Sequence, residues 1–228
     1  MQNAKSIVML GATGAVGGCV LAALARAPGI ARLTLLGRRP PGVTLPFAVV
    51  NHLIDVRQPD SFAVMGAHQD VANCTFGVGQ PTKVLRSELV QIDHDAVLAF
   101  ARACKAAGVQ HFQLLSSVGA DPASRSFYLR TKGALEEDLR ALSFTRLSLF
   151  QPSMILTPTN RYGFSQALTL AVWPSLTPLL ARGLRRFRGI PVARLGQAFV
   201  TNMEISATGT EMLEWDEIMA LSKDDGAL

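Results

Sequence analysis

The glycine-rich segment GATGAVGG, residues 11–18, constrains the fold of this chain more than any other feature. The apolar run IVML precedes it and the helix-forming run CVLAALARA follows it, so the order is strand, turn and helix. Glycines at positions 11, 14 and 17 allow a sharp turn, a close backbone approach to a ligand, and close packing of the helix on the strand. The unpaired amides at the start of such a helix can bind a pyrophosphate.

The segment has two interpretations, a dinucleotide site and a packed turn without a ligand. The strand that follows the helix completes a βαβ unit, which favours the dinucleotide site. The residues expected to contact that cofactor are Gly11, Thr13, Gly14, Ala15, Val16 and Gly17.

Short apolar runs alternate with helical patterns over the first two-thirds of the chain, which is typical of a parallel sheet covered by helices. This predicts an α/β fold with a parallel sheet built from βαβ units. The expected strands are Ser6–Leu10, Leu33–Leu36, Phe47–Val50, Val71–Phe76, His111–Leu115 and Thr145–Phe150.

Two long amphipathic helices are expected, from Val84 to Ala107 and from Phe127 to Leu142. Apolar residues recur at spacings of three and four in both. In the second helix the core-facing stripe begins with Tyr128 and Lys132 and leaves Glu136 outside it.

Length and composition indicate one folded domain spanning residues 1–228, since hydrophobic residues make up 49% of the chain and charged residues only 17%. The alternation loosens after Phe150, so about residues 151–228 are expected to form a small C-terminal region on the substrate side. The apolar segment Ala167–Ala181 contains Trp173 and is interrupted by prolines. It is expected to be a buried or interfacial helix pair, because it is too short to span a bilayer.

The net charge of +5 comes from short basic clusters and not from a long basic face, so no nucleic-acid partner is expected. Cys19, Cys74 and Cys104 lack metal-ligand spacing, which predicts reduced thiols and no metal site. No signal-peptide pattern precedes the first strand. We therefore expect a cytoplasmic protein without stable membrane insertion, and the sequence leaves a homodimer open.

The second expected strand ends in Gly37-Arg38-Arg39, where an NAD-preferring site usually carries an acidic residue. Arg38 and Arg39 suit the 2′-phosphate of NADPH, because the planar guanidinium matches phosphate oxygens. The alternative is that both arginines are solvated loop residues. Asp55, after the third strand, either hydrogen-bonds the adenine or caps the helix that begins near Pro59.

The fifth expected strand ends in Ser116-Ser117, and Tyr128 and Lys132 follow on one helix face. A phenol is ordinarily a poor acid or base at neutral pH, and a nearby ammonium stabilises its phenolate form. Tyr128 can then exchange a proton with a carbonyl oxygen, and a serine at the strand end can hydrogen-bond the same oxygen. The alternative is a surface tyrosine and lysine beside an apolar stripe.

The segments GATGAVGG, LLGRRP, LLSSVGAD, YLRTK and FQPSMIL, in this order, resemble the short-chain dehydrogenase/reductase superfamily in its atypical, extended-like branch. Within that branch the chain is most similar to the Tat-interacting protein group, over about residues 5–200. The resemblance implies a Rossmann fold, with a doubly wound parallel sheet, that binds NADPH and carries a Ser-Tyr-Lys site. In that site Ser117 is the serine, with Ser116 as the close alternative.

The resemblance also implies that Gly77, Pro152 and Met154 line the nicotinamide ribose side, and that Lys132 binds this ribose. The chain departs from the pattern of the superfamily at three places. The fourth expected strand ends in CTFGVGQP, where relatives often have a CxGTT-like ending. The asparagine usual in the helix after the fourth strand is absent, and Asp93 is the nearest polar residue beside the stripe of that helix. Gln151 replaces the arginine that usually precedes the proline after the sixth strand.

The sequence thus predicts an NADP(H)-dependent reductase that transfers hydride to a small-molecule carbonyl substrate, a ketone, an aldehyde or a quinone. The alternative is an NADPH-binding regulatory or sensor protein with little turnover, because a fold alone does not establish catalysis. A sugar-nucleotide epimerase or dehydratase is disfavoured by the two arginines and by the small region after Phe150.

Overall fold

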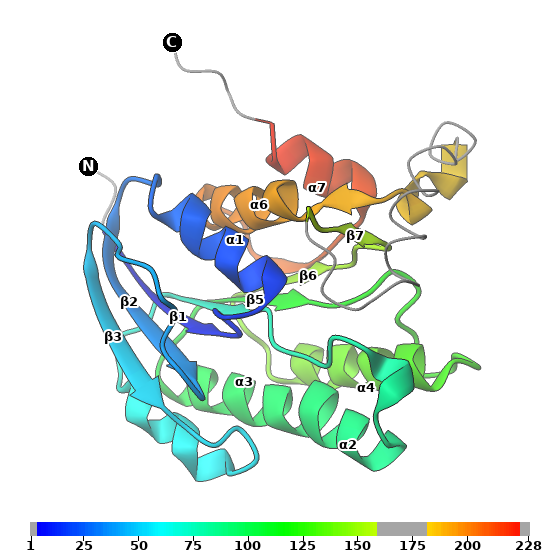
Figure 1. Ribbon diagram of the computed structural model, residues 1–228, viewed down its shortest axis with the longest axis horizontal. Coiled ribbons are helices and arrows are strands. Elements are labelled where there is room, and N and C mark those ends of the chain that lie inside the picture. The colour runs from blue at the N-terminus through cyan, green and yellow to red at the C-terminus, as the bar shows by residue number, and fades with distance from the viewer. Residues whose placement is uncertain (1–3, 159–181, 224–228) are drawn as a thin grey trace.

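The computed structural model describes residues 4–158 and 182–223, and within them it shows a seven-stranded parallel sheet covered by helices on both faces (Figure 1). Neighbouring strands are parallel in every pair, which confirms the predicted Rossmann-type fold. In spatial order the strands are β3 (Ala48–Leu53), β2 (Ile30–Gly37), β1 (Lys5–Leu10), β4 (Val71–Cys74), β5 (His111–Leu115), β6 (Arg146–Phe150) and β9 (Gly209–Leu213).

The direction of winding reverses between β1 and β4, which lie side by side. The chain moves outward from β1 to β2 and β3, and then returns to place β4 on the other side of β1. Loops at the carboxyl ends of β1 and β4 therefore diverge to opposite faces of the sheet. Ligands of open α/β sheets bind in the crevice at such a point.

Helices α1 (Ala15–Leu24), α6 (Val192–Glu204) and α7 (Trp215–Leu221) cover one face of the sheet, as Figure 1 shows. The other face is covered by α2 (Arg86–Val90), α3 (Ala96–Ala106), α4 (Phe127–Ala141) and the 3-10 helix η1 (Pro59–Met65). Each face buries its own apolar cluster, so the sheet separates two cores.

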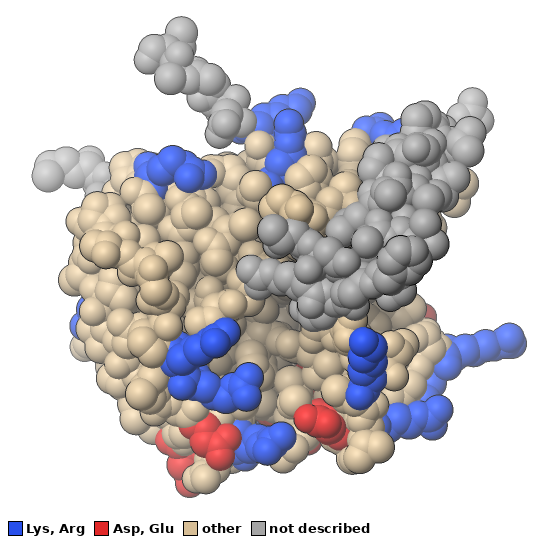
Figure 2. Space-filling view, in the orientation of Figure 1, with Lys and Arg blue, Asp and Glu red and all other residues tan. Residues whose placement is uncertain are grey.

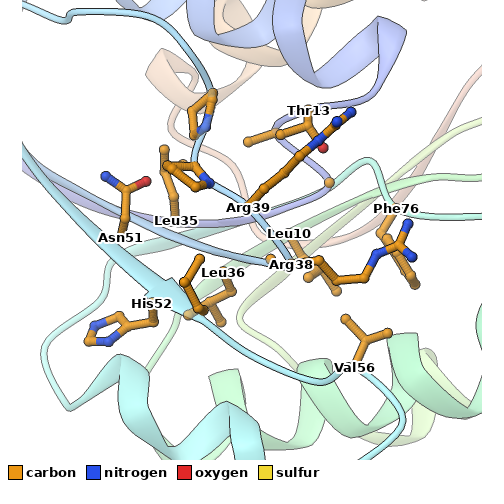
Figure 3. Close-up of a pocket in the computed structure, with 16 residues that line it drawn as sticks. Leu10, Thr13, Leu35, Leu36, Arg38, Arg39, Asn51, His52, Val56 and Phe76 are labelled. Carbon is orange, nitrogen blue, oxygen red and sulfur yellow. The ribbon is translucent and has the colours of Figure 1, made fainter.

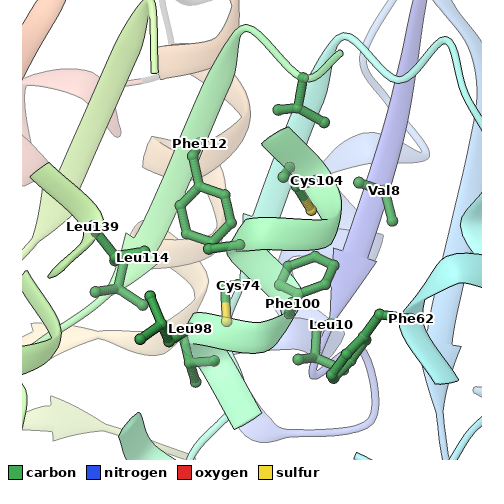
Figure 4. Close-up of a cluster of buried hydrophobic side chains, with 14 of the residues drawn as sticks. Val8, Leu10, Phe62, Cys74, Leu98, Phe100, Cys104, Phe112, Leu114 and Leu139 are labelled. Carbon is green, nitrogen blue, oxygen red and sulfur yellow. The ribbon is translucent and has the colours of Figure 1, made fainter. Parts of the chain in front are cut away.

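The core beneath α3 and α4 contains a row of aromatic rings, most of which Figure 4 shows. Phe100 lies 5.7 Å from Phe62 and 5.8 Å from Phe112, centroid to centroid, in the tilted arrangement that aromatic pairs favour. In the opposite core the rings of Phe150 and Phe199 stack at 3.9 Å. These contacts fix α3 and α6 on the two faces of the sheet.

The helix expected from Val84 to Ala107 is divided in the structure. It consists of α2, the π-helical segment η3 (Gln91–Asp95) and α3, and it begins at Arg86. Leu85, which the prediction placed inside the helix, is the N-cap of α2 and is 74% exposed. The extra residue in the π-helical turn rotates the side chains of α3 relative to those of α2 about the helix axis. A single helical period therefore does not describe the whole segment.

The C-terminal region contains elements that the sequence did not predict. The strand β9 extends the sheet beyond β6, and α6 and α7 pack beside α1. The chain also forms the helical turn η2 (Pro81–Lys83), the 3-10 helix η5 (Arg182–Phe187), and the two-stranded ribbon of β7 (Ile155–Leu156) and β8 (Ile190–Pro191). The expected helix pair in Ala167–Ala181 lies outside the described residues. Among the helices that are described, none is long and apolar enough to cross a membrane.

Buried polar side chains connect β5, β6, β9 and α6 near the amino ends of the strands. Glu211 accepts hydrogen bonds from Arg146 at 2.7 Å, Asn202 at 3.2 Å and the Ser148 hydroxyl at 2.5 Å. Because Ser148 gives its only hydroxyl proton to Glu211, His111 Nε2, 2.7 Å away, must donate to Ser148 Oγ. Burial, and then the nearby charges of Arg146 and Lys5, lower the pKa of His111 to about 3.

The folded protein should therefore lose stability in mild acid because of His111. The unfolded chain binds a proton at this histidine below about pH 6.5, whereas the folded chain does so only near pH 3. The free energy of unfolding should fall by about 2 kcal/mol between pH 6.5 and 4.5 from this group alone. Urea denaturation of His111→Gln at pH 7 and pH 4.5 should show that much less acid sensitivity.

His68→Asn provides the control, since His68 is exposed and has a φ of +65° that asparagine also adopts. This variant should keep the acid sensitivity of the parent protein. Equal acid sensitivity in His111→Gln and the parent would contradict the assignment.

Candidate active site

The β1–α1 turn brings backbone atoms too close together for larger residues. Gly11 has a φ of +96°, and a Cβ atom there would lie 2.6 Å from the backbone nitrogen of Phe76. A Cβ atom at Gly17 would lie 2.1 Å from the carbonyl oxygen of Gly11. Gly14 is the N-cap of α1 and makes no side-chain cap, so the amides of the first helical turn face the turn region unblocked. These residues form a cradle of the kind that binds a pyrophosphate.

A cavity of about 430 Å³ lies between this turn and the ends of β2 and β3 (Figure 3). Gly11 and Thr13 line it, together with Arg38 and Arg39, and Figure 3 shows the arginines among its lining side chains. Hence the two arginines belong to a cavity next to the glycine-rich turn. The surface in Figure 2 is hollowed near its middle, and basic side chains border this hollow.

Asp55 lies outside the lining of this cavity, although its neighbour Val56 is part of it. The Asp55 carboxylate accepts a hydrogen bond from the backbone of Arg57 at 3.0 Å, and its carbonyl oxygen accepts one from Ser61. The η1 helix has Gln58 as its N-cap. Asp55 therefore stabilises the turn before η1 and is not the cap of that helix.

A second cavity, of about 580 Å³, collects most of the remaining predicted residues. Ser117 at the end of β5 lines it, as do Tyr128 and Lys132 on α4. Five residues predicted to bind the cofactor also line it: Gly14, Ala15, Val16, Gly77 and Met154. Phe76 lines both cavities, so they meet at the end of β4.

Gly17 and Pro152 line neither cavity. Gly17 serves the packing of α1 against the turn, as its close approach to Gly11 shows. The carbonyl oxygen of Pro152 accepts a hydrogen bond from the backbone of Val118, which joins the loops after β5 and β6.

The start of α4 fixes Tyr128 and Lys132. Ser126 is the N-cap, and its hydroxyl oxygen accepts a hydrogen bond from the backbone of Leu129. Lys132 Nζ lies 6.0 Å from the centroid of the Tyr128 ring, and Lys132 is 3% exposed while Tyr128 is partly exposed. The pair is thus not a surface feature, because its ammonium group is buried at the base of the cavity.

The two adjacent serines differ in their surroundings. Ser116 is 5% exposed, and its hydroxyl donates a hydrogen bond to Glu136 at 2.5 Å. Ser117 is partly exposed at the cavity wall. The hydroxyl of Ser116 is therefore occupied by a protein partner, whereas Ser117 faces the space that a ligand would enter.

Asp93 has a larger role than its sequence position suggested. It is 1% exposed within η3, lies 3.5 Å from Lys132 Nζ, and accepts a hydrogen bond from the backbone of Val78 at 2.6 Å. A Cβ atom at Gly77 would lie 2.9 Å from the same carboxylate. Asp93 thus links the buried lysine to the loop after β4. A signal existed in the sequence, since Asp93 lies four residues from both Leu89 and Val97, which are buried.

Lys132 is charged in the folded protein. Burial alone would lower the pKa of Lys132, but Coulomb interactions with Tyr128 and with Asp93 outweigh burial and raise the pKa above its usual value. The ammonium is therefore retained at neutral pH in a site with almost no contact with water.

Removing the carboxylate should lower the pKa of Lys132. In Asp93→Asn the amide oxygen can still accept the hydrogen bond from Val78, but the Coulomb attraction to the ammonium is lost. We expect the NMR titration of the Lys132 Cε resonance to move to lower pH. The chain has five lysines, and Lys132→Arg assigns the signal.

Asp95→Asn is the matched control, because Asp95 is a carboxylate of the same segment with a 61% exposed side chain. This change should leave the Lys132 titration in place. A Lys132 resonance that titrates identically in Asp93→Asn and the parent would show that the ion pair does not govern its charge.

The parallel sheet, the glycine cradle and the two adjoining cavities define a protein of the NAD(P)H-binding Rossmann class. Comparison with known families agrees, since residues 11–161 match the family described as NAD(P)H-binding. The chain belongs to this family, within the atypical group of the short-chain dehydrogenase/reductase superfamily.

Two relatives illustrate this membership. The chain is 33% identical to Protein HTATIP2 of Rattus norvegicus over 229 residues, which cover 98% of this chain and 91% of the relative. It is 30% identical to Protein FMP52, mitochondrial, of Saccharomyces cerevisiae over 81% of this chain and 80% of the relative. The expectation of a cytoplasmic protein is overturned by these comparisons, because the FMP52 relatives are named as mitochondrial proteins.

Solved structures share the fold at low sequence identity. The structure described as MoeE5 in complex with UDP-glucuronic acid and NAD superposes with a TM-score of 0.70 and 15% identity. The superposition covers 95% of this chain and 81% of that chain. At this identity the similarity shows the Rossmann fold and nothing about the substrate.

Proposed function

We propose that this protein is an NADPH-dependent oxidoreductase that reduces the carbonyl group of a small molecule, a ketone, an aldehyde or a quinone. One observation supports this most strongly: a single cavity beside the glycine-rich turn is lined by Ser117, Tyr128 and Lys132. A proton donor, a hydrogen-bond donor and a buried cation thus lie together where a nicotinamide cofactor is expected to end.

The described residues fit the cofactor along its length. The cradle of Gly11 and Gly14 and the amides of α1 would hold the pyrophosphate, and Arg38 and Arg39 would hold the 2′-phosphate. At the other end Gly77 and Met154, which line the second cavity, would border the nicotinamide ribose. The bound cofactor supplies hydride, which is chemistry that no side chain provides.

The protein supplies the proton and the orientation. Tyr128 donates its hydroxyl proton to the carbonyl oxygen as negative charge develops there, and Ser117 donates a hydrogen bond to the same oxygen. Lys132 stabilises the resulting phenolate through its buried positive charge and binds the nicotinamide ribose. Asp93 holds Lys132 in place through their ion pair.

The names of the fungal relatives support a mitochondrial location for this activity. The UDP-sugar ligands named for MoeE5 do not lead us to propose a sugar-nucleotide substrate, because Arg38 and Arg39 favour NADPH over the NAD of that complex.

Replacement of Tyr128 tests catalysis. Tyr128→Phe removes the proton donor and keeps the ring, so kcat for reduction of a carbonyl substrate should fall by about 10² to 10⁴. The Kd for NADPH, measured by fluorescence titration, should stay within about twofold. Full activity in Tyr128→Phe would refute the role of Tyr128. A parent protein that binds NADPH and reduces none of a broad carbonyl panel would favour the regulatory alternative.

Cofactor preference tests the arginines. NADPH should raise the thermal unfolding midpoint more than NADH at equal concentration, because tighter binding to the native state stabilises it more. Arg38→Ala and Arg39→Ala should each raise the Kd of NADPH by about tenfold and change that of NADH little.

Arg57→Ala is the matched control, since Arg57 is an exposed arginine that lines neither cavity. It should leave both affinities unchanged. Stronger stabilisation by NADH than by NADPH would overturn the assignment of the 2′-phosphate site.

A further inference from the structure

A second buried carboxylate lies behind the candidate site. Glu136, which the sequence placed outside the core-facing stripe of its helix, is 2% exposed. One of its oxygens accepts hydrogen bonds from Ser116 at 2.5 Å and from the Gln151 amide at 2.8 Å. The other accepts from Gln151 at 3.1 Å and from Arg140 at 3.2 Å. Every one of these partners comes from the protein, so the carboxylate is satisfied without a ligand.

Each partner of Glu136 stands next to a segment of the candidate site. Ser116 directly precedes Ser117 at the end of β5, and Gln151 directly precedes Pro152 at the end of β6. Glu136 itself lies one helical turn beyond Lys132 and two beyond Tyr128 on α4, because residues four apart share a helix face. One carboxylate therefore joins three of the elements that supply the site: the end of β5, the end of β6 and α4.

The ends of β5 and β6 also stay paired beyond the last residues of the strands. The backbone of Ser116 donates to the carbonyl of Phe150 at 2.7 Å, and that of Val118 donates to the carbonyl of Pro152 at 3.1 Å. These bonds fix the two strand ends to each other but not to α4. Among the described contacts, the hydrogen bonds of Glu136 join that pair of strand ends to the helix that carries Tyr128 and Lys132.

We infer that Glu136 is a positioning residue that sets the distance of Tyr128 and Lys132 from Ser117 and from the segment Pro152–Met154. The inference rests on the proposed function for its effect on rate. It also explains how a neutral Gln151 is accommodated. Arg140, whose side chain is 38% exposed, supplies the positive charge for the carboxylate from the same helix. Because Arg140 carries the positive charge, Gln151 needs only to donate hydrogen bonds to Glu136. The arginine that is usual at position 151 is therefore not required to neutralise the carboxylate.

Exchanging the side chains of Glu136 and Gln151 tests the inference. Gln151→Glu places a second carboxylate within about 3 Å of the first, where like charges repel strongly. This variant should lower kcat on the order of 100-fold, the scale of a small misplacement of catalytic groups. The double variant Glu136→Gln with Gln151→Glu restores one carboxylate and one amide. It should recover kcat to within about tenfold of the parent protein, while KM stays nearly constant throughout.

Two readouts do not depend on turnover. The emission of bound NADPH reports on the surroundings of the nicotinamide, and it should change in Gln151→Glu and return in the double variant. The urea midpoint should follow the same order. If the parent protein reduces no carbonyl compound, the proposed function fails, and these two measurements still decide whether Glu136 positions the site.

Glu137→Gln is the matched control, because Glu137 is the exposed neighbour of Glu136 on the same helix. It should leave kcat, NADPH emission and the urea midpoint unchanged. A double variant no better than Gln151→Glu would overturn the inference. The inference would also be overturned if Glu136→Gln and Gln151→Glu, each made alone, left kcat, NADPH emission and the urea midpoint unchanged, as Glu137→Gln should.

Discussion

The contact between the β1–α1 turn and the end of β4 is the constraint on which the site depends. A Cβ atom at Gly11 would approach the Phe76 backbone to 2.6 Å, and Thr75 donates backbone and side-chain hydrogen bonds to the carbonyls of Leu10 and Gly11. Both cavities adjoin this contact, which lies where the winding of the sheet reverses. A side chain at Gly11 would push the two strand ends apart and change the width of the crevice.

The buried charges of the site follow from its place against an apolar core. Isolated charges there would be costly, because desolvation of an ion is offset only by close partners. Lys132 has Asp93, and Glu136 has Arg140 together with neutral donors. Such groups add little net stability but hold a defined geometry, and they lie on the face of the sheet where α4 presents Tyr128.

The parallel sheet and the side chains of Ser117, Tyr128 and Lys132 could be predicted from the sequence, because both depend on local patterns. Six strands were expected near their observed positions, and the spacing of Tyr128 and Lys132 placed them on one helix face. The seventh strand was missed because β9 lies at the edge of the sheet, and most of its residues are exposed. An edge strand lacks the continuous apolar run that marks a buried one.

Asp93 and Glu136 were misjudged for different physical reasons. At 3.6 residues per turn Asp93 falls at the edge of the apolar stripe, four residues after Leu89, and the π-helical turn shifts the phase of the helix so that its carboxylate is fully buried. Glu136 lies four residues from Lys132 and three from Leu139, which puts it on the buried face, but a carboxylate is rarely buried without partners. Those partners, Ser116 and Gln151, are distant in sequence and become adjacent only through strand pairing.

The two serines at the end of β5 have different roles: one is held by a protein partner and the other lines the cavity. Successive residues of an extended chain point in opposite directions, so a pair of identical side chains meets two environments. The Ser116 hydroxyl is held by a buried carboxylate, whereas Ser117 is partly exposed on the cavity wall. The orientation of Ser117 is therefore set by the anchoring of its neighbour, which leaves its own hydroxyl available to a ligand.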